Sequence, residues 1–258
     1  MIMDNHSQLK DTDQGQFPEL WYEIVEQNHF WFYWRLRSLL KVIRKLRIDL
    51  NANHKGLDIG SGNALLIKQM ELLSLWAIDG CDISPKFIKN TKIRGFYIQY
   101  DIFEKDKELK EKYDFVFLFD ILEHLNDPKT FLEAAAFYLK KGGLIFINVP
   151  AFQTLYGKYD LAVGHKARYD RKSINSWLGS ALFSIEDFRY WGMILYPLVL
   201  IRKLLTTYSN NNVKIITRGM KTPNKYINEL LKYVANIETT FISKPPFGCS
   251  LILTLRKK

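Results

Sequence analysis

The chain has 258 residues, enough for one large domain or for one domain that carries an inserted cap. Its formal net charge of +10 favours acidic partners, such as nucleic acid, anionic lipid or a phosphorylated substrate, although the scattered basic residues also fit an ordinary solvated surface. Two cysteines, Cys81 and Cys249, are too few for a disulfide framework, and we expect buried thiols in a reducing cytoplasm. No secretory signal is recognised, and the longest apolar run, residues 193–201, is far shorter than the ~20 residues that span a bilayer.

The first half of the chain alternates between helical and strand-like segments. The polar residues 1–17 are predicted to be disordered. Residues 18–47 are predicted to form a helix, because their apolar residues recur at helical spacing. Short strands separated by helices then predict a doubly wound α/β sheet. The predicted strands are residues 56–59, 76–82, 96–100, 115–119 and 144–149, and the predicted helices are residues 64–73, a helix that begins at Pro85, and residues 128–139, which Gly142 and Gly143 follow.

The pattern changes after Pro150. Residues 151–172 form a long polar and aromatic connection, and long loops of this kind usually carry function. The segments predicted beyond this loop are a helix at 172–181, a strand at 183–191, an apolar helix at 192–208, an amphipathic helix at 223–239 and a last strand at 250–255.

A glycine turn after the first strand is the most informative local pattern. Gly60 and Gly62 let a ligand approach the backbone closely, and Asp82 stands where the second strand ends, suited to ribose hydroxyls. The dinucleotide fingerprint requires a third glycine, but Leu65 occupies that position. Asp58 would repel phosphates and attract a cation or an ammonium group. Adenosine with a sulfonium and an amino-acid tail therefore suits this turn better than NAD.

Five segments in order resemble the motifs of the class I S-adenosylmethionine (SAM)-dependent methyltransferases. The first is an acid followed by glycines, Asp58, Gly60 and Gly62, with Ala64 in place of the third glycine. Asp82 and Asp101 match the second and third motifs, and residues 113–125 and 139–150 match the fourth and fifth. The fourth segment is similar to the small-molecule subgroup that includes quinone-biosynthesis methyltransferases. Part of the 151–172 loop resembles enzymes of polysaccharide and lipid gene clusters.

The resemblance implies a Rossmann-like fold and a cofactor site. The fold would be a seven-stranded sheet with an N-terminal helix, a last strand that runs antiparallel, and residues 192–242 inserted as a helical cap in a domain spanning 18–258. Arg35 would approach the methionine carboxylate of SAM, or would be a solvated residue of an amphipathic helix. The residues that the resemblance assigns to SAM are Arg35, Asp58, Gly60, Ser61, Gly62, Asp82, Ile83, Asp101, Ile102, Asp120, Ile121 and His124.

The acceptor is expected beyond the fourth and fifth strands. On the resemblance, His124 lies beside the transferred methyl group, as a base or as a structural contact. His165 and Tyr169 would remove a proton or contact the substrate, or would anchor the loop. Tyr156, Tyr159 and Arg168 are further substrate-binding candidates, and the basic residues of the loop favour a phosphate or carboxylate on the acceptor. The spacing of histidines and cysteines predicts no metal site.

These patterns favour methyl transfer to a small or lipid-linked molecule, at oxygen. An RNA or protein methyltransferase is the second interpretation, motivated by the basic charge, but the segment after the fourth strand lacks the motif of enzymes that methylate amino groups. The third is a non-catalytic partner subunit with the same fold. The apolar stretch around Tyr196 to Leu205 has two basic residues, Arg202 and Lys203, near its end. It is either a packed cap helix or a peripheral contact with an anionic membrane.

Overall fold

The structure is a computed structural model that describes residues 28–84, 92–178, 182–206 and 211–258. The segment predicted to be disordered, residues 1–17, lies outside the described residues, as do the first part of the predicted 18–47 helix and the start of the helix predicted at Pro85.

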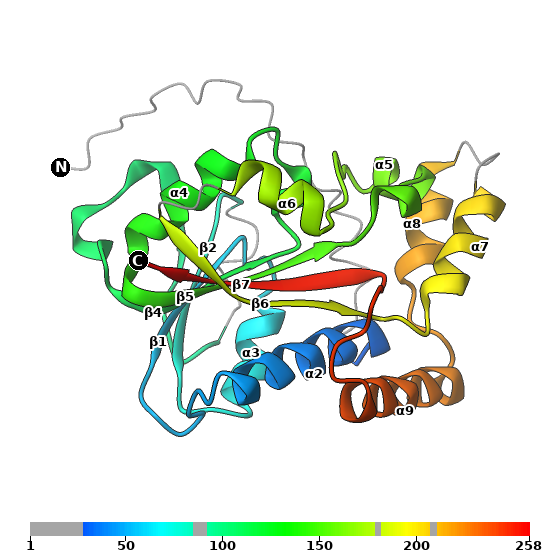
Figure 1. Ribbon diagram of the computed structural model, residues 1–258, viewed down its shortest axis with the longest axis horizontal. Helices are drawn as coiled ribbons and strands as arrows, with labels where there is room; N and C mark the ends of the chain where they lie inside the picture. Colours follow the sequence, from blue (N-terminus) through cyan, green and yellow to red (C-terminus); the bar gives the residue numbers. More distant parts are fainter. Residues whose placement is uncertain (1–27, 85–91, 179–181, 207–210) are drawn as a thin grey trace.

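A seven-stranded sheet in this part of the chain confirms the predicted architecture, and its strand order is β3-β2-β1-β4-β5-β7-β6 (Figure 1). The strands from β3 to β5 are parallel, whereas β7 is antiparallel to both β5 and β6. The bounds are β1 Lys55–Ile59, β2 Ala77–Asp82, β3 Tyr97–Gln99, β4 Tyr113–Phe119, β5 Leu139–Pro150, β6 Phe183–Trp191 and β7 Ser250–Lys257.

Hydrophobic packing on both faces explains why β4 lies at the centre. Its side chains are apolar from Phe115 to Phe119, and Val116 pairs with Leu57 on one side and Ile145 on the other. Because both faces of a parallel sheet are covered by helices, such a strand carries no polar alternation.

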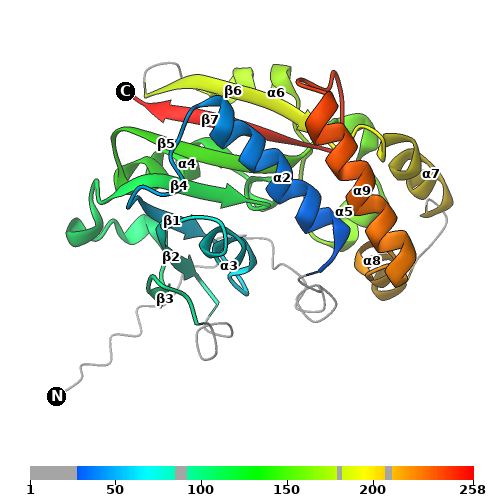
Figure 2. The same ribbon diagram turned by 90° about the horizontal axis from the view of Figure 1, so that it is seen from below.

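Helices cover the two faces of the sheet unequally (Figures 1 and 2). One face carries α4 (Pro128–Tyr138) and α6 (Arg171–Trp177), and the other carries α2 (Phe30–Lys45), α3 (Leu65–Glu71) and α9 (Lys225–Phe241). Short 3-10 helices at Ile102–Glu104, Lys107–Leu109, Leu122–His124 and Gln153–Leu155 join the strands to these layers. Among the described residues, no helix is long and apolar enough to cross a membrane.

The region between β6 and β7 is helical, but its helices pack in two different places. α7 (Tyr196–Thr206) and α8 (Asn212–Met220) lie with α5 (Lys158–Ala162) beyond the carboxyl ends of the central strands. α9 instead packs beside α2, where the Tyr33 hydroxyl donates to Asn236 Oδ1 at 2.8 Å and Lys41 Nζ donates to the Thr239 carbonyl at 2.6 Å. The sequence did not predict α8, and it placed the end of α4 too late, since the helix stops at Tyr138 and β5 begins at once.

Glu238 of α9 holds the α2 layer to the bend after β6. Its buried carboxylate accepts from Trp34 Nε1 at 3.1 Å and from the backbone N–H groups of Gly192 at 2.7 Å and Ile194 at 3.1 Å. Three donors, two of them in buried hydrogen bonds, therefore depend on one side chain.

We expect Glu238→Ala to lower the free energy of unfolding by about 3 kcal/mol, because it leaves buried donors unsatisfied. Urea denaturation measures this. Glu229→Ala, on the same helix but with a side chain 55% exposed, is the control and should change stability by less than about 0.5 kcal/mol. Equal effects of the two substitutions would contradict this role of Glu238.

Candidate active site

The glycine turn after β1 has the backbone conformation that its sequence requires. Gly60 and Gly62 have φ angles of +67° and +50°, in the left-handed region that favours glycine. The Gly60 N–H donates to the Cys81 carbonyl at 2.8 Å, and the Gly62 N–H donates to Asp82 Oδ2 at 3.0 Å. A Cβ at Gly60 would lie 2.6 Å from Ile121 Cδ1, so a larger residue would have to displace that side chain as well as adopt the positive φ. The turn is thus tied to the end of β2 and lies against the segment after β4.

Ala64 stands where the resembled motif has its third glycine, and its backbone has a left-handed conformation of the kind that favours glycine. Its φ is +57° and its ψ is 32°, and its side chain is fully buried. The left-handed region costs a residue with a Cβ about 1–2 kcal/mol. Alanine at this position therefore carries some backbone strain that glycine would not.

The acids predicted for SAM meet at one edge of the sheet. Asp82 ends β2, Asp101 precedes the 3-10 helix at Ile102–Glu104 and caps it by accepting from the Phe103 N–H at 2.9 Å, and Asp120 follows β4. Ile83 is 56% exposed, whereas Ile102 is almost fully buried. Because parallel strands end on the same side, the turn and these acids form one cradle with polar groups for a ribose and a cationic tail. These residues fit S-adenosylmethionine.

Arg35 does not project alone toward the cradle, because its buried side chain forms an ion pair with the partly exposed Asp120. Its Nη1 lies 2.5 Å from Asp120 Oδ2, and its guanidinium lies 5.1 Å from the ring centres of Phe32 and Phe119. Asn148 Nδ2 donates to Asp120 Oδ1 at 2.6 Å, and Trp191 Nε1 donates to Asn148 Oδ1 at 2.9 Å. The pair places Arg35 inside the site and makes it more than a solvated helix residue. Its predicted contact with a methionine carboxylate stays a prediction.

Asp58 lies under the glycine turn, buried to 3% exposure. Burial raises the pKa of its carboxyl to about 8, against the opposing effect of the Arg35 charge. Burial likewise raises the pKa of Asp82, although the N–H groups of Ser84 and Gly62 partly stabilise its charge. The cradle therefore contains carboxyl groups that become more acidic when a cation approaches.

The two candidate histidines lie side by side beyond β4. The rings of His124 and His165 are 4.9 Å apart, centre to centre. His124 Nδ1 lies 3.1 Å from the Gly164 carbonyl oxygen, and burial lowers the pKa of His124 to about 3, assisted by the neighbouring His165. A ring with so low a pKa is a weak base at neutral pH.

His165 is oriented by a buried carboxylate. Its Nδ1 lies 2.8 Å from Asp160 Oδ1, which also accepts from Arg168 Nε at 2.8 Å, while Asp160 Oδ2 accepts from the Gly157 N–H at 2.9 Å. Burial alone would raise the pKa of Asp160, but the hydrogen bonds and charges of His165 and Arg168 outweigh it and lower that pKa. Asp160 is therefore an ionised group that fixes the loop after β5.

The predicted tyrosines separate into two kinds. The Tyr169 hydroxyl donates to the Leu122 carbonyl at 2.8 Å from a buried position, and the Tyr156 hydroxyl donates to the His165 carbonyl at 2.7 Å. Both therefore hold the loop in place. Tyr159 lines the cavity described next.

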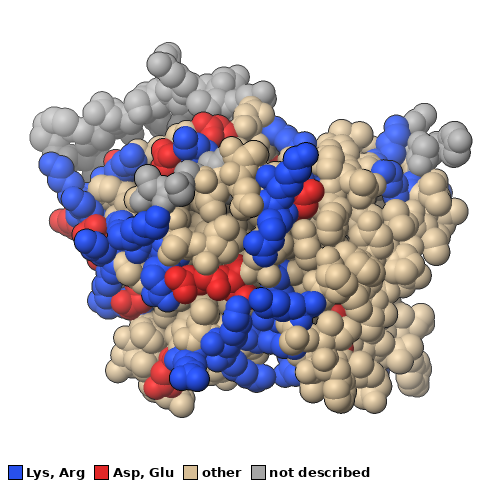
Figure 3. All heavy atoms as spheres, viewed as in Figure 1, with Lys and Arg blue, Asp and Glu red and all other residues tan. Residues whose placement is uncertain are grey.

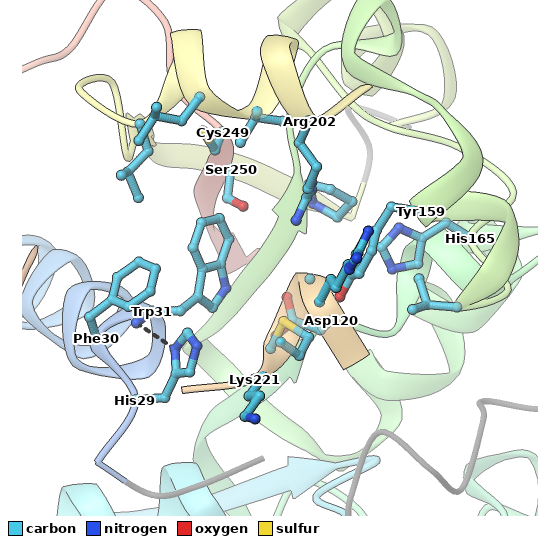
Figure 4. Close-up of a pocket in the computed structure, with 18 of the residues that line it drawn as sticks. His29, Phe30, Trp31, Asp120, Tyr159, His165, Arg202, Lys221, Cys249 and Ser250 are labelled. Carbon is cyan, nitrogen blue, oxygen red and sulfur yellow. Dashed lines mark hydrogen bonds between the residues drawn. The ribbon is translucent and has the colours of Figure 1, made fainter. Parts of the chain in front are cut away.

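A cavity of about 290 Å³ lies beyond the carboxyl ends of β4 and β5, under α7 and α8 (Figure 4). Asp120 and His165 face it, together with Trp31 from the start of α2. Its polar lining includes four basic residues, Arg168, Arg202, Arg218 and Lys221, and its apolar lining includes Leu195, Leu198, Val199, Met220 and Leu231.

Part of this lining was not predicted. Arg218 and Lys221 belong to α8 and its end, and the sequence interpretation had no helix there. Asn211, whose side chain accepts from the Lys214 N–H, was a helix-start signal that could have identified it. Glu123, His124 and His165 also come together, with one ligand atom from each within 4.8 Å of the others, although their spacing predicted no metal site.

Comparison with known proteins agrees with this geometry. The family model for the methyltransferase domain matches residues 16–196. The ubiquinone biosynthesis O-methyltransferase of Brucella ovis is 33% identical over 118 residues, which are 42% of this chain and 47% of that protein. The chain thus spans about half the length of the curated relatives it matches.

Solved structures show the same fold at low sequence identity. The plantazolicin methyltransferase BamL, in complex with a triazolic desmethylPZN analog and SAH, has a TM-score of 0.54 at 14% identity, covering 87% of this chain and 84% of that chain. The cyclase SpnF has a TM-score of 0.53 at 15% identity, covering 87% and 80%. Because a cyclase shares the fold, the fold alone does not define the reaction.

The fold and the cradle define a Rossmann-like methyltransferase domain. The chain belongs to the methyltransferase-domain family, as the family match over most of its length shows, and the cradle fits S-adenosylmethionine as the methyl donor.

We expect Asp82→Ala to weaken SAM binding at least tenfold, about 1.4 kcal/mol, since it removes the carboxylate at the end of β2 and the acceptor for the Gly62 N–H. Calorimetric titration measures this. Asp82→Asn keeps one acceptor oxygen and should lose less SAM affinity than Asp82→Ala. Glu108→Ala, at an exposed residue, is the control and should bind SAM as the unmodified chain does. Unchanged affinity in Asp82→Ala would refute the placement of the cradle.

Asp58→Asn should change the pH dependence of stability. The folded chain keeps the Asp58 proton up to about pH 8, whereas the unfolded chain releases it near pH 4. Between pH 4 and pH 8 the unfolding free energy of the unmodified chain therefore decreases, by at most about 1.4 kcal/mol per pH unit, and above pH 8 it becomes constant. The variant lacks this contribution. Denaturation from pH 4 to 8 should show the variant gaining in relative stability as pH rises, and parallel profiles would exclude the shift.

Proposed function

We propose that this chain is a SAM-dependent methyltransferase that methylates an oxygen of a small anionic molecule with an apolar part. The apolar part would be longest in a lipid-linked acceptor. The observation that carries the proposal is the cavity beside Asp120. This residue belongs both to the cofactor edge of the sheet and to the cavity wall, so an acceptor in the cavity lies next to the cradle.

The residues around the cavity can position an acceptor without elaborate chemistry. Bound SAM supplies a methyl group on a sulfonium, which is already a good leaving group. The protein must then hold the acceptor oxygen in line and remove its proton. Glu123 and His165 line the cavity and are the candidates for removing this proton, and Asp160 holds the His165 ring in place. The resemblance of the matched segment to ubiquinone O-methyltransferases supports oxygen as the atom methylated.

The cavity favours an anionic acceptor because Arg202 brings an uncompensated charge into it. Its guanidinium lies 4.3 Å from the ring centre of Tyr159, and neither Arg202 nor Arg218 forms an ion pair with a carboxylate in the described part of the chain. Burial lowers the pKa of Arg202, and the nearby Arg168 charge adds to this effect. Arg202 is half-buried and Arg218 is exposed, so of the two only Arg202 is a partly desolvated cation without a carboxylate partner among the described residues, and a phosphate or carboxylate would offset that cost with charge-assisted hydrogen bonds.

The other wall favours an apolar group that extends out of the cavity. Leu198 lines the cavity and is also 57% exposed, so the apolar wall continues onto the outer face of α7. Leu204 and Leu205 of that helix are 69% and 77% exposed. Figure 3 shows few charged side chains over α7 and α9, whereas lysines and arginines gather over the sheet. A lipid tail could therefore leave the cavity across α7, and peripheral membrane contact is part of the proposal.

An activity assay tests the proposed reaction directly. The protein is incubated with methyl-labelled SAM and candidate acceptors, which are hydroxylated aromatic carboxylates and lipid phosphates with a free hydroxyl, and the products are analysed by mass spectrometry. Labelled methyl on an acceptor oxygen supports the proposal. SAM binding with methylation of RNA or protein alone would replace it with the second interpretation from the sequence, and SAM binding with no product across all classes would favour a partner subunit.

Arg202→Met should raise the KM for an anionic acceptor at least tenfold and leave the affinity for SAM unchanged, because the arginine faces the acceptor cavity and not the cradle. Steady-state kinetics and SAM calorimetry separate the two effects. Lys214→Ala removes an exposed charge from α8 outside the cavity lining and is the control. A KM equal to that of the unmodified chain would argue against the anion contact.

The membrane contact predicts co-sedimentation with anionic phospholipid vesicles. Replacing both Leu204 and Leu205 with serine should reduce the bound fraction severalfold, since it removes exposed apolar area from α7. Leu72→Ser, at an equally exposed leucine that follows α3, should bind as the unmodified chain does. Absence of binding by the unmodified chain would remove the membrane contact from the proposal.

A further inference from the structure

Three potential ligands for a metal ion converge on one side of the cavity. Glu123 and His124 belong to the 3-10 helix after β4, and His165 comes from the loop after α5. One ligand atom from each lies within 4.8 Å of the other two. Glu123 and His124 are buried, whereas the His165 side chain keeps 12% of its surface exposed, and both Glu123 and His165 line the cavity. The group is therefore accessible from the cavity and shielded from bulk solvent.

The surroundings fix both imidazole rings for metal binding through Nε2. A carbonyl oxygen only accepts, so the contact of His124 Nδ1 with the Gly164 oxygen at 3.1 Å places the proton on Nδ1. The same holds for His165 Nδ1 and the carboxylate of Asp160 at 2.8 Å, where Arg168 Nε supports Asp160 at 2.8 Å. A neutral ring protonated on Nδ1 carries its lone pair on Nε2. Metal-binding histidines usually have this kind of support from a carboxylate or a backbone carbonyl.

Glu123 needs a partner that the described residues do not provide. Its Oε1 lies 3.9 Å from His165 Nε2, too far for a hydrogen bond, and its buried Oε2 has no hydrogen-bond partner among those residues. An uncompensated buried carboxylate is costly. An ion with bonds of about 2.1 Å to an oxygen and a nitrogen can bridge such a gap, whereas a shared proton cannot.

We infer that Glu123, His124 and His165 bind one divalent transition-metal ion of the zinc class, with an open position toward the cavity. Two imidazoles and one carboxylate are a donor set that such ions accept, and catalytic zinc sites commonly combine three protein ligands with one exchangeable position. The binding site stands independently of methyl transfer. Its use rests on the proposed function: an acceptor hydroxyl at the open position would lose its proton more readily and would be held for in-line attack.

Metal titration of the whole chain tests the inference. Protein stripped with a chelator and dialysed is titrated with Zn²⁺ by calorimetry and with Co²⁺ by visible absorption, and the expected result is one equivalent of each. Glu123→Gln and His165→Asn should each weaken the affinity at least tenfold. His54→Asn is the control, since His54 lies by Asp114 at the other end of the sheet.

The outcomes separate the metal site from the proposed function. Failure of the unmodified chain to bind either ion stoichiometrically would overturn the inference, and so would variants that bind as tightly as the unmodified chain. Circular dichroism and SAM calorimetry on the same samples confirm that each variant is folded, and His124→Asn replaces any variant that is not. Stoichiometric metal binding without methyl transfer would keep the site and reject its proposed use.

Discussion

The ion pair between Arg35 and Asp120 is the interaction on which the arrangement of the site depends. It joins a helix that precedes the sheet to the end of the central strand, and Asn148 and Trp191 extend it to β5 and β6. The same cation also offsets part of the cost of burying Asp58 under the glycine turn. The buried Arg35 guanidinium therefore offsets the repulsion between Asp58 of β1 and Asp120 after β4, which the parallel strands bring to the same edge of the sheet.

The pair also connects the two halves of the site. Asp120 belongs to the cradle for the cofactor on one side and to the acceptor cavity on the other. A ligand that brings its own positive charge to the cradle would compete with Arg35 for these carboxylates, whereas a ligand carboxylate would attract the guanidinium. The cofactor edge is thus electrostatically matched to a zwitterionic amino-acid tail beside a sulfonium.

The sequence predicted the doubly wound sheet, the glycine turn and the cofactor edge because each has a local pattern in the sequence. Gly60, Gly62 and Asp82 depend on a turn and the end of the next strand, and the apolar run of β4 is typical of a central parallel strand. Even Ala64, which departs from the motif, has the left-handed backbone that favours glycine. What the sequence could not show was which partner Arg35 would choose, because that contact joins residues 85 positions apart.

The acceptor side was harder to predict because it is assembled from distant segments. Arg202, Arg218 and Lys221 come from the inserted helices, and the grouping of Glu123 with His165 depends on how the loop after β5 folds back. Tyr169 could have been a catalytic residue from its sequence, yet its hydroxyl binds a backbone carbonyl in the core. Only the cavity distinguishes the side chains that face a ligand from those that hold the loop.

Calorimetric titration of the unmodified chain with SAM and with its demethylated product is the most direct test of the account. Micromolar binding of both, with one site per chain, is the predicted result, because the cradle is formed by residues of a single sheet edge. Absence of binding by either compound would contradict the account at its centre, since the turn, the acids and the Arg35–Asp120 pair would then have no ligand to hold.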